Sequence, residues 1–215
     1  GLAGVWADAR INAVCLGPGM GLDARAAELV RVALETSRLR VKLGAAQGLA
    51  VVLDADAVTL IARDVGLFAL LHEGCLLTPH AGEFARLFPD IAARLAAPAV
   101  TGPAYSKVDA TREAAKRAGC VVLYKGADTV IAAPDGRCAI NAAVYDRSAP
   151  WLATAGSGDV LAGFITGLLA RGFQPFDAAC TAAWLHVECA RSFGPGLIAE
   201  DLPEELPKVF RGLGI

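Results

Sequence analysis

The sequence lacks the features that would place it on a membrane or on nucleic acid. A membrane-spanning helix needs about 20 apolar residues, and the nearest stretch, Val160–Ala170, is too short. Basic and acidic residues are mixed along the chain, which carries a net charge of -2 and no basic stripe. No signal peptide is recognisable at the start. We therefore expect a cytoplasmic protein that binds neither membranes nor nucleic acid.

Several common catalytic and metal-binding patterns are also missing. No GxxxxGK[ST] P-loop and no GxGxxG fingerprint occurs, and Gly156–Gly158 has the wrong spacing for the GxSxG elbow of a hydrolase. The three histidines, His72, His80 and His186, stand far apart, so no metal-ligand cluster is expected. The six cysteines include no CxxC pair and stand mostly among Ala, Val and Leu. Buried, reduced thiols are therefore favoured over a metal site or disulfides.

What the chain does have is the composition of one large α/β domain. It contains 215 residues, of which 55% are hydrophobic and 20% charged, and such a chain can bury a large core. Four short apolar runs bounded by Gly, Asp or Pro are interpreted as buried strands: Ala13–Leu16, Leu49–Leu53, Cys75–Leu77 and Cys120–Tyr124. Helical patterns alternate with them: Asp23–Leu39, Ala57–Ala62 continuing loosely to Leu71, and Ser106–Ala118. This alternation predicts a mostly parallel sheet with helices on both faces.

The second half of the chain breaks the parallel pattern. Val130–Ala133 and Arg137–Ile140 flank a Pro-Asp-Gly turn, which predicts an antiparallel hairpin. Two helices are expected after it, Asp159–Arg171 and Phe176–Phe193. Both are apolar on nearly all sides and should be deeply buried.

Unusual residues recur where each predicted strand ends. The segments are Gly17–Gly21, Asp54–Asp56, Thr78–Glu83 and Lys125–Thr129. Because ligands of open α/β sheets bind outside the carboxyl ends of the strands, this recurrence predicts a functional site.

Each of these segments also has a plain structural interpretation. The glycine loop could let a ligand approach the backbone or could simply form a tight turn. Asp54 and Asp56 could bind Mg²⁺ indirectly or cap the next helix. Lys125 could contact phosphate or be a solvated strand end. Thr78 is expected to cap a helix with Pro79 in its first position, which would leave His80 facing the cleft.

The segment Ala155–Asp159, Ala-Gly-Ser-Gly-Asp, leads directly into a predicted helix. Glycines before a helix let N–H groups converge on an anion, and a carboxylate there can deprotonate an attacking hydroxyl. Phosphoryl transfer needs this combination of an anion cradle and a base, although Asp159 could also be an ordinary cap. Gly163 and Gly167 lie one turn apart and are interpreted as close contacts between this helix and the sheet.

Together, these segments resemble the ADP/ATP-dependent NAD(P)H-hydrate dehydratases, a ribokinase-like family related to carbohydrate kinases. Gly17–Gly21 is similar to the family's GPGLG loop, and LTPHAGEFARL at Leu77–Leu87 resembles its TPHPGE segment. KGADT at Lys125–Thr129 resembles its nucleotide-binding KGAGT, and AGSGDVLAG at Ala155–Gly163 resembles its GGTGDVLAG. The tail Gly196–Pro207 also follows the family pattern.

The resemblance implies a three-layer αβα ribokinase-like fold and a repair reaction. Hydrated NADH or NADPH would be phosphorylated on its hydroxyl by ADP or ATP, and phosphate would then leave. Asp159 would be the catalytic base. The residues facing the hydrated cofactor would be Gly19, Gly21, His80 and Asp159. The residues holding the nucleotide would be Lys125, Gly126, Ala127, Asp128, Thr129, Gly156, Ser157 and Gly158, with Mg²⁺ on the phosphates.

The chain departs from the family pattern in two places. Ala149-Pro150-Trp151 replaces an Asn-Pro-Gly stretch, and the family has a further strand and helix before the strand that leads to Gly17–Gly21. We therefore expect residues 1–215 to form a single ribokinase-like domain without that strand and helix. The resulting open sheet edge would favour a homo-oligomer. Two alternatives remain: a ribokinase-like kinase of a small alcohol, and a non-catalytic nucleotide-binding module.

Overall fold

A single six-stranded sheet organises the chain. The computed structural model describes residues 2–6, 8–42 and 48–215. The strands lie side by side in chain order: β1 (Ala13–Leu16), β2 (Ala50–Leu53), β3 (Cys75–Leu77), β4 (Val121–Tyr124), β5 (Asp128–Ala132) and β6 (Cys138–Ala142). The first four are parallel, and β5 and β6 pair antiparallel. The predicted parallel sheet and its hairpin are both confirmed.

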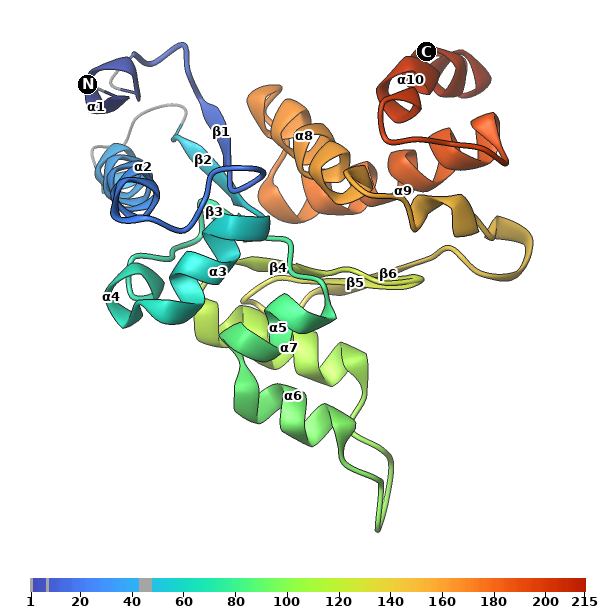
Figure 1. Cartoon of the computed structure of the whole chain (residues 1–215), viewed down its shortest axis with the longest axis horizontal. Helices are drawn as coiled ribbons and strands as arrows, with labels where there is room; N and C mark the ends of the chain where they lie inside the picture. Colours follow the sequence, from blue (N-terminus) through green and yellow to red (C-terminus); the bar gives the residue numbers. More distant parts are fainter. Residues whose placement is uncertain (1, 7, 43–47) are drawn as a thin grey trace.

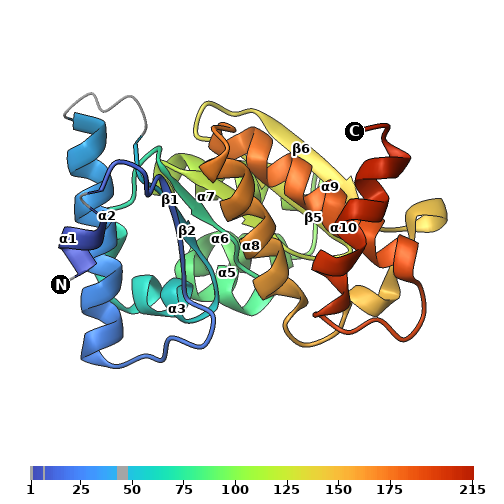
Figure 2. The same ribbon diagram turned by 90° about the horizontal axis from the view of Figure 1, so that it is seen from above.

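Helices cover both faces of this sheet (Figure 1). One layer holds α2 (Ala24–Lys42), α3 (Ala55–Arg63), α4 (Val65–Phe68), α5 (Ala81–Leu87), α6 (Pro89–Ala96) and α7 (Lys107–Ala118), with the short α1 (Leu2–Trp6) beside α2. The other holds α8 (Ser157–Ala170), α9 (Pro175–Phe193) and α10 (Asp201–Gly212). Seen from above, α10 lies at the opposite end of the molecule from α1 and α2 (Figure 2).

Each central strand contributes to two separate cores because successive side chains point to opposite faces. Leu53 and Leu77 pack on the α2–α7 side, whereas Val52, Leu76 and Leu123 pack against α8 and α9. All five side chains are fully buried. Burial on both faces explains why the strands read as short continuous apolar runs rather than alternating patterns.

One predicted helix needs adjustment. The helical pattern at Ala57 does not continue unbroken to Leu71, because α3 ends at Arg63. Asp64 then takes an extended conformation, and its side chain accepts hydrogen bonds from the backbone N–H groups of Gly66 and Leu67, which starts α4. Ser106 caps α7 as predicted.

The prediction of two deeply buried helices is confirmed for α9 and wrong for α8. Nine of the 19 residues of α9 are buried, whereas α8 buries only Leu161, Ala162, Ile165 and Leu169. Gly163 and Gly167 do not touch the sheet: both are exposed, and a Cβ on either would meet nothing within 4 Å. Because α8 is apolar on nearly all sides, the sequence did not reveal that this helix packs on one side only.

Two further findings concern the chain as a whole. All six cysteines are free thiols. None of the helices in the described parts of the chain combines the length and apolar character that crossing a lipid bilayer requires.

Candidate active site

The loop between β4 and β5 is held in place by a lysine from α7. Lys107 Nζ donates hydrogen bonds to the backbone carbonyl oxygens of Asp128, at 2.6 Å, and Lys125, at 3.4 Å. It also lies 4.5 Å from the centre of the Tyr124 ring. A Cβ on Gly126 would lie 2.7 Å from this ammonium, so glycine permits the close approach. Lys107 was not among the residues predicted from the sequence, although a cation in the first turn of a helix opposes the macrodipole and is itself a signal.

Lys125 lies at the end of β4 and pairs with carboxylates from two other elements. Its Nζ lies 2.7 Å from Asp54 Oδ1 and 3.9 Å from Glu83 Oε2. Thr78 Oγ1 donates a second hydrogen bond to Asp54 Oδ1 at 2.8 Å. Asp54 is 1% exposed, and a buried carboxylate needs such partners. Lys125 is therefore not a solvated strand end.

The side chain of Asp54 does not cap α3, although the residue occupies the N-cap position. Its carboxylate turns instead toward Lys125 and Thr78, because pairing a buried charge outweighs capping a helix. The interpretation of Asp54 as a side-chain cap of the next helix is therefore wrong. Asp56 does not act only within its own helix either, since its Oδ2 accepts a hydrogen bond from the N–H of Gly21 at 2.8 Å.

The N-terminus of α8 faces the Lys125 ammonium. Gly156 is the N-cap residue, with φ of 83°, and a Cβ on Gly158 would lie 3.3 Å from Lys125 Nζ. Ser157 Oγ donates to the carbonyl of Leu152 at 2.7 Å, and the His186 ring bonds to the Ser157 carbonyl at 2.8 Å. A helix N-terminus and an ammonium group thus point at one place, which is a favourable position for an anion.

Asp159 is the third residue of α8 and is exposed. Its pKa is raised, first by partial burial and then by the negative charge of Asp54, while Lys125 acts in the opposite direction. A raised pKa makes a carboxylate a stronger base. This placement and its electrostatics fit the predicted role of Asp159 as the group that accepts a proton.

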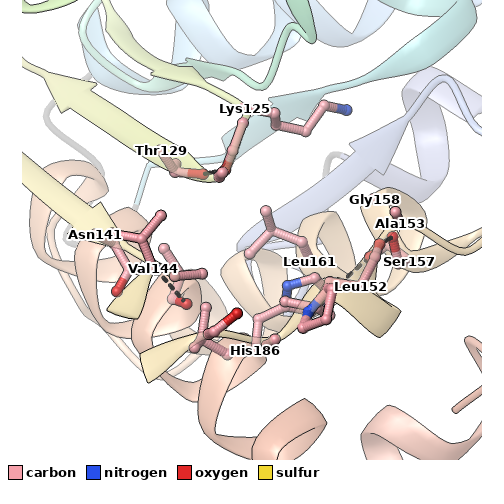
Figure 3. A pocket seen from close by; sticks show the side chains of 18 residues that line it. Lys125, Thr129, Asn141, Val144, Leu152, Ala153, Ser157, Gly158, Leu161 and His186 are labelled. Carbon is pink, nitrogen blue, oxygen red and sulfur yellow. Dashed lines mark hydrogen bonds between the residues drawn. The ribbon is translucent and has the colours of Figure 1, made fainter. Parts of the chain in front are cut away.

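A cavity of about 500 Å³ opens beside these residues (Figure 3). Six of the predicted nucleotide residues line it: Lys125, Gly126, Ala127, Thr129, Ser157 and Gly158. Asp128 and Gly156 adjoin lining residues without lining the cavity themselves. The predicted substrate residues Gly19, Gly21, His80 and Asp159 lie outside its lining. The structure thus separates the two predicted groups of site residues.

The inner wall of the cavity comes from residues that the sequence analysis did not select. Asn141 on β6 donates to the Ala183 carbonyl at 2.9 Å and accepts from Arg147 at 3.1 Å. His186 on α9 also lines the cavity, and burial lowers its pKa to about 4. Most other lining residues of this wall are apolar: Ala143, Val144, Ala149, Leu152, Leu161 and Val187. A mostly apolar wall with few fixed polar groups is typical of a small-molecule site.

His80 is the N-cap residue of α5, so the prediction that Thr78 caps this helix with Pro79 in its first position is wrong. The ring Nδ1 accepts hydrogen bonds from the N–H groups of Gly82 and Glu83, at 3.0 and 3.4 Å. Imidazole can thus replace the usual Ser or Asp cap. Because Nδ1 accepts, the proton lies on Nε2, which is 3.3 Å from Glu83 Oε1. The His80 side chain is 54% exposed at this edge of the sheet.

The glycine loop after β1 is a tight turn fastened to the first turn of α3. Gly17 has φ of 131°, and the Gly21 N–H bonds to Asp56 as described above. The outer side of the loop is open, because a Cβ on Gly19 or Gly21 would meet nothing within 4 Å. The structural interpretation of the loop is confirmed, and its predicted contact with substrate stays a prediction.

Comparisons with known proteins find relatives of this chain. A family model described as NAD(P)H-hydrate dehydratase matches residues 4–209. The bifunctional NAD(P)H-hydrate repair enzyme Nnr of Moorella thermoacetica is 37% identical over 210 residues, covering 95% of this chain and 36% of its own length. Its counterpart from Mycobacterium tuberculosis is 40% identical over 170 residues, covering 79% of this chain and 30% of that protein. The chain therefore spans about a third of the length of these curated relatives.

Solved structures show the same fold. The ADP/ATP-dependent NAD(P)H-hydrate dehydratase of Bacillus subtilis, co-crystallised with ATP and Mg²⁺ and soaked with CoA, superposes with a TM-score of 0.68 at 26% identity. The match covers 96% of this chain and 70% of that one. A ribokinase-like superfamily protein from Enterococcus faecalis superposes with a TM-score of 0.75 at 23% identity, covering 98% of this chain and 66% of its own. The predicted ribokinase-like fold is confirmed.

Proposed function

The chain belongs to the NAD(P)H-hydrate dehydratase family, and we propose that it removes the added water from hydrated NADH or NADPH at the expense of ADP or ATP. One observation carries the proposal. The Lys125 ammonium and the N-terminus of α8 meet beside a nucleotide-sized cavity, with Asp159 in the first turn of the same helix. Phosphoryl transfer requires an anion site and a base in this arrangement.

The cavity is assigned to the nucleotide. Its apolar wall suits a purine ring, while Lys125 and the first residues of α8 lie where phosphates would find positive charge. Thr129 and the backbone of Gly126 form the rim of the same cavity and fix the loop that carries Lys125. The hydrated cofactor is assigned to the other side of Asp159, toward His80 and the loop of Gly19 and Gly21.

The proposed reaction has two steps. Asp159 accepts the proton of the substrate hydroxyl, whose oxygen forms a bond to the terminal phosphorus as the bond to the leaving nucleotide breaks. ADP thereby becomes AMP, or ATP becomes ADP. In the second step phosphate leaves with the electrons of the C–O bond, the neighbouring ring carbon gives its proton to the departing phosphate, and the electrons of that C–H bond form the double bond. Lys125 and the N–H groups of α8 stabilise charge on the transferred group.

A magnesium ion is expected with the nucleotide rather than in a protein cage. Across residues 2–6, 8–42 and 48–215, no three His, Cys, Asp or Glu side chains are grouped so that they could hold a metal. Mg²⁺ commonly takes most of its ligands from phosphates and water, and it would supply charge neutralisation there. No residue of the chain is assigned to it, and the roles of Asp159 and Lys125 do not depend on its position.

The test is recovery of NADH absorbance from NADH hydrate with Mg²⁺ and either ADP or ATP. Asp159→Asn should slow recovery by at least about a hundredfold while calorimetry shows that nucleotide binding persists. Asp177→Asn is the matched control, because Asp177 is an exposed carboxylate in the first turn of α9. Nucleotide binding without recovery in the unmodified chain would contradict the proposal. Accumulation of a phosphorylated alcohol alone would indicate a kinase instead.

A further inference from the structure

Asp54 and Lys125 form an ion pair that does not include the proposed base, Asp159. Resting on the proposed function, we propose that Asp54 is a positioning residue that holds the Lys125 ammonium at the N-terminus of α8 and prevents it from pairing with Asp159. Lys125 is then presented to phosphate and Asp159 to the substrate hydroxyl. Asp54 itself touches neither ligand, because its side chain is 1% exposed.

The geometry favours this division of roles. The two carboxylates that pair with Lys125 Nζ are Asp54, at 2.7 Å, and Glu83, at 3.9 Å. No ion pair of the described residues joins Lys125 to Asp159, although the ammonium lies next to the site of a Cβ on Gly158, the residue before Asp159. A lysine side chain is flexible and needs a fixed partner to stay in one place. Asp54 is that partner.

The Asp54 carboxylate is suited to this role because it is only partly satisfied. Its Oδ1 receives both Lys125 and Thr78, whereas its buried Oδ2 has no hydrogen-bond partner within the described part of the chain. The negative charge of Asp54 therefore shifts the pKa of neighbouring groups. Burial, then Asp54, raise the pKa of Asp159, and Lys125 lowers it. If the Lys125 ammonium moved from Asp54 to Asp159, it would form an ion pair with the Asp159 carboxylate and lower its pKa. Asp159 would then be a weaker base.

Neighbouring titratable groups lie on α5, β1 and α9. On α9, the pKa of His186 is lowered to about 4, first by burial and also by the charge of Lys125. Glu83 faces Lys125 from α5, and His80 faces Glu83 from the N-cap of the same helix. Cys15 on β1 lies near enough to be affected by both carboxylates. Burial raises the pKa of its thiol to about 11, and the negative charges of Asp54 and Asp159 add to this rise. A thiol with that pKa stays neutral near pH 7. Asp54 and Lys125 are therefore the charges that set the titration of Asp159.

The test measures the titration of Asp159 directly. Carbon-13 NMR of aspartate-labelled protein follows its carboxyl, which Asp159→Asn identifies by removing one signal. In Asp54→Asn the titration should move to lower pH, because a negative neighbour is lost and Lys125 is freed to pair with Asp159. In Lys125→Met the Asp159 titration should move to higher pH, because a positive neighbour is lost. In the double variant, which combines Asp54→Asn with Lys125→Met, the Asp159 titration should return close to that of the unmodified protein. Asp64→Asn is the control: Asp64 caps α4, which is distant in the fold, and its substitution should leave the Asp159 titration unchanged.

Kinetics and binding separate positioning from a structural role. In Asp54→Asn, kcat should fall roughly tenfold or more, and the acid limb of the pH profile should move with the titration. The Kd for ADP should rise about threefold or more, because the freed Lys125 ammonium is no longer held at the phosphate site. A folded Asp54→Asn whose Asp159 titration does not move would overturn the proposal. Should that variant fail to fold, an unmoved titration in Lys125→Met would do the same.

The outcomes for the two proposals are distinguishable. If NADH hydrate is not converted but the Asp159 titration shifts as described, the proposed function is wrong and the role of Asp54 stands. If conversion occurs and the titration is insensitive to Asp54 and Lys125, the function stands and the positioning role is wrong.

Discussion

The backbone carbonyl of Asp54 occupies the space that any side chain at Gly17 would need. A Cβ built on Gly17 would lie 1.8 Å from Asp54 O, and Gly17 also has φ of 131°. The ends of β1 and β2 meet here, and Asp54 donates its N–H to Leu16 O at 3.0 Å. Because Asp54 also pairs with Lys125, the close approach of Gly17 connects the first loop to the proposed phosphate site.

Gly17→Ala should therefore destabilise the protein by about 3 kcal/mol, through backbone strain and overpacking together. Gly119→Ala provides the control. Gly119 also has a positive φ, of 65°, but a Cβ there would meet nothing within 4 Å, so the expected loss is about 1 kcal/mol. Urea unfolding measures both values. Equal losses would show that the contact with Asp54 is relieved by local movement.

Lys107 is expected to support nucleotide binding without taking part in catalysis. Lys107→Met removes the hydrogen bonds to the Asp128 and Lys125 carbonyls that hold the β4–β5 loop. The Kd for ADP should rise about tenfold, equivalent to about 1.4 kcal/mol, with kcat nearly unchanged. Lys116→Met, an exposed lysine of the same helix, should leave the Kd alone. A fall in kcat at constant Kd would indicate instead that Lys107 acts on the reacting groups.

The parts of the fold that sequence reasoning predicted are those governed by local pattern. The four apolar runs became β1 to β4 within one residue, and the turn at Pro134–Gly136 placed the β5–β6 hairpin. Ends of parallel strands meet at one sheet edge, so Lys125 and Asp54 could be placed at the same site in advance. Their separation of 71 residues left their direct pairing undetermined by the sequence.

The errors share a physical cause, which is competition that only the tertiary structure decides. Asp54 stands at an N-cap, but pairing with Lys125 prevails over capping. Gly163 and Gly167 are as small as packing glycines, yet the register of α8 turns them to the surface. His80 caps α5 through Nδ1, a role that its sequence neighbours Thr78 and Pro79 appeared to fill. Local preference ranked these options incorrectly because their energies differ by only about 1 kcal/mol.

Substitution can separate the capping role of His80 from its proposed role in substrate binding. Its ring caps α5, and its exposed edge is assigned to substrate. His80→Ala should cost about 1 kcal/mol of stability and also reduce kcat/KM for NADH hydrate. His80→Asn should restore the cap and the stability but not kcat/KM. Thermal unfolding and the absorbance assay provide the two measurements, and full recovery of kcat/KM in His80→Asn would reduce the role of His80 to capping.

The buried His186 makes stability depend on pH. Burial lowers its pKa to about 4 in the folded protein, whereas an unfolded chain regains an ordinary value near 6.5. Between these values the unfolded chain binds more protons, so stability is fully present above about pH 6.5 and falls as the pH drops toward 4. From pH 7 to pH 5 this one group should remove about 2 kcal/mol of unfolding free energy.

His186→Gln isolates that contribution, because glutamine does not titrate and can still donate a hydrogen bond to the Ser157 carbonyl that the ring contacts. Urea unfolding of both proteins at pH 7 and pH 5 gives the comparison. The unmodified chain should lose about 2 kcal/mol more than the variant over this interval. Equal losses would mean that His186 is protonated in the folded state. The N-terminus of α8 would then carry an extra positive charge beside the proposed phosphate site, and ADP binding would strengthen as the pH falls.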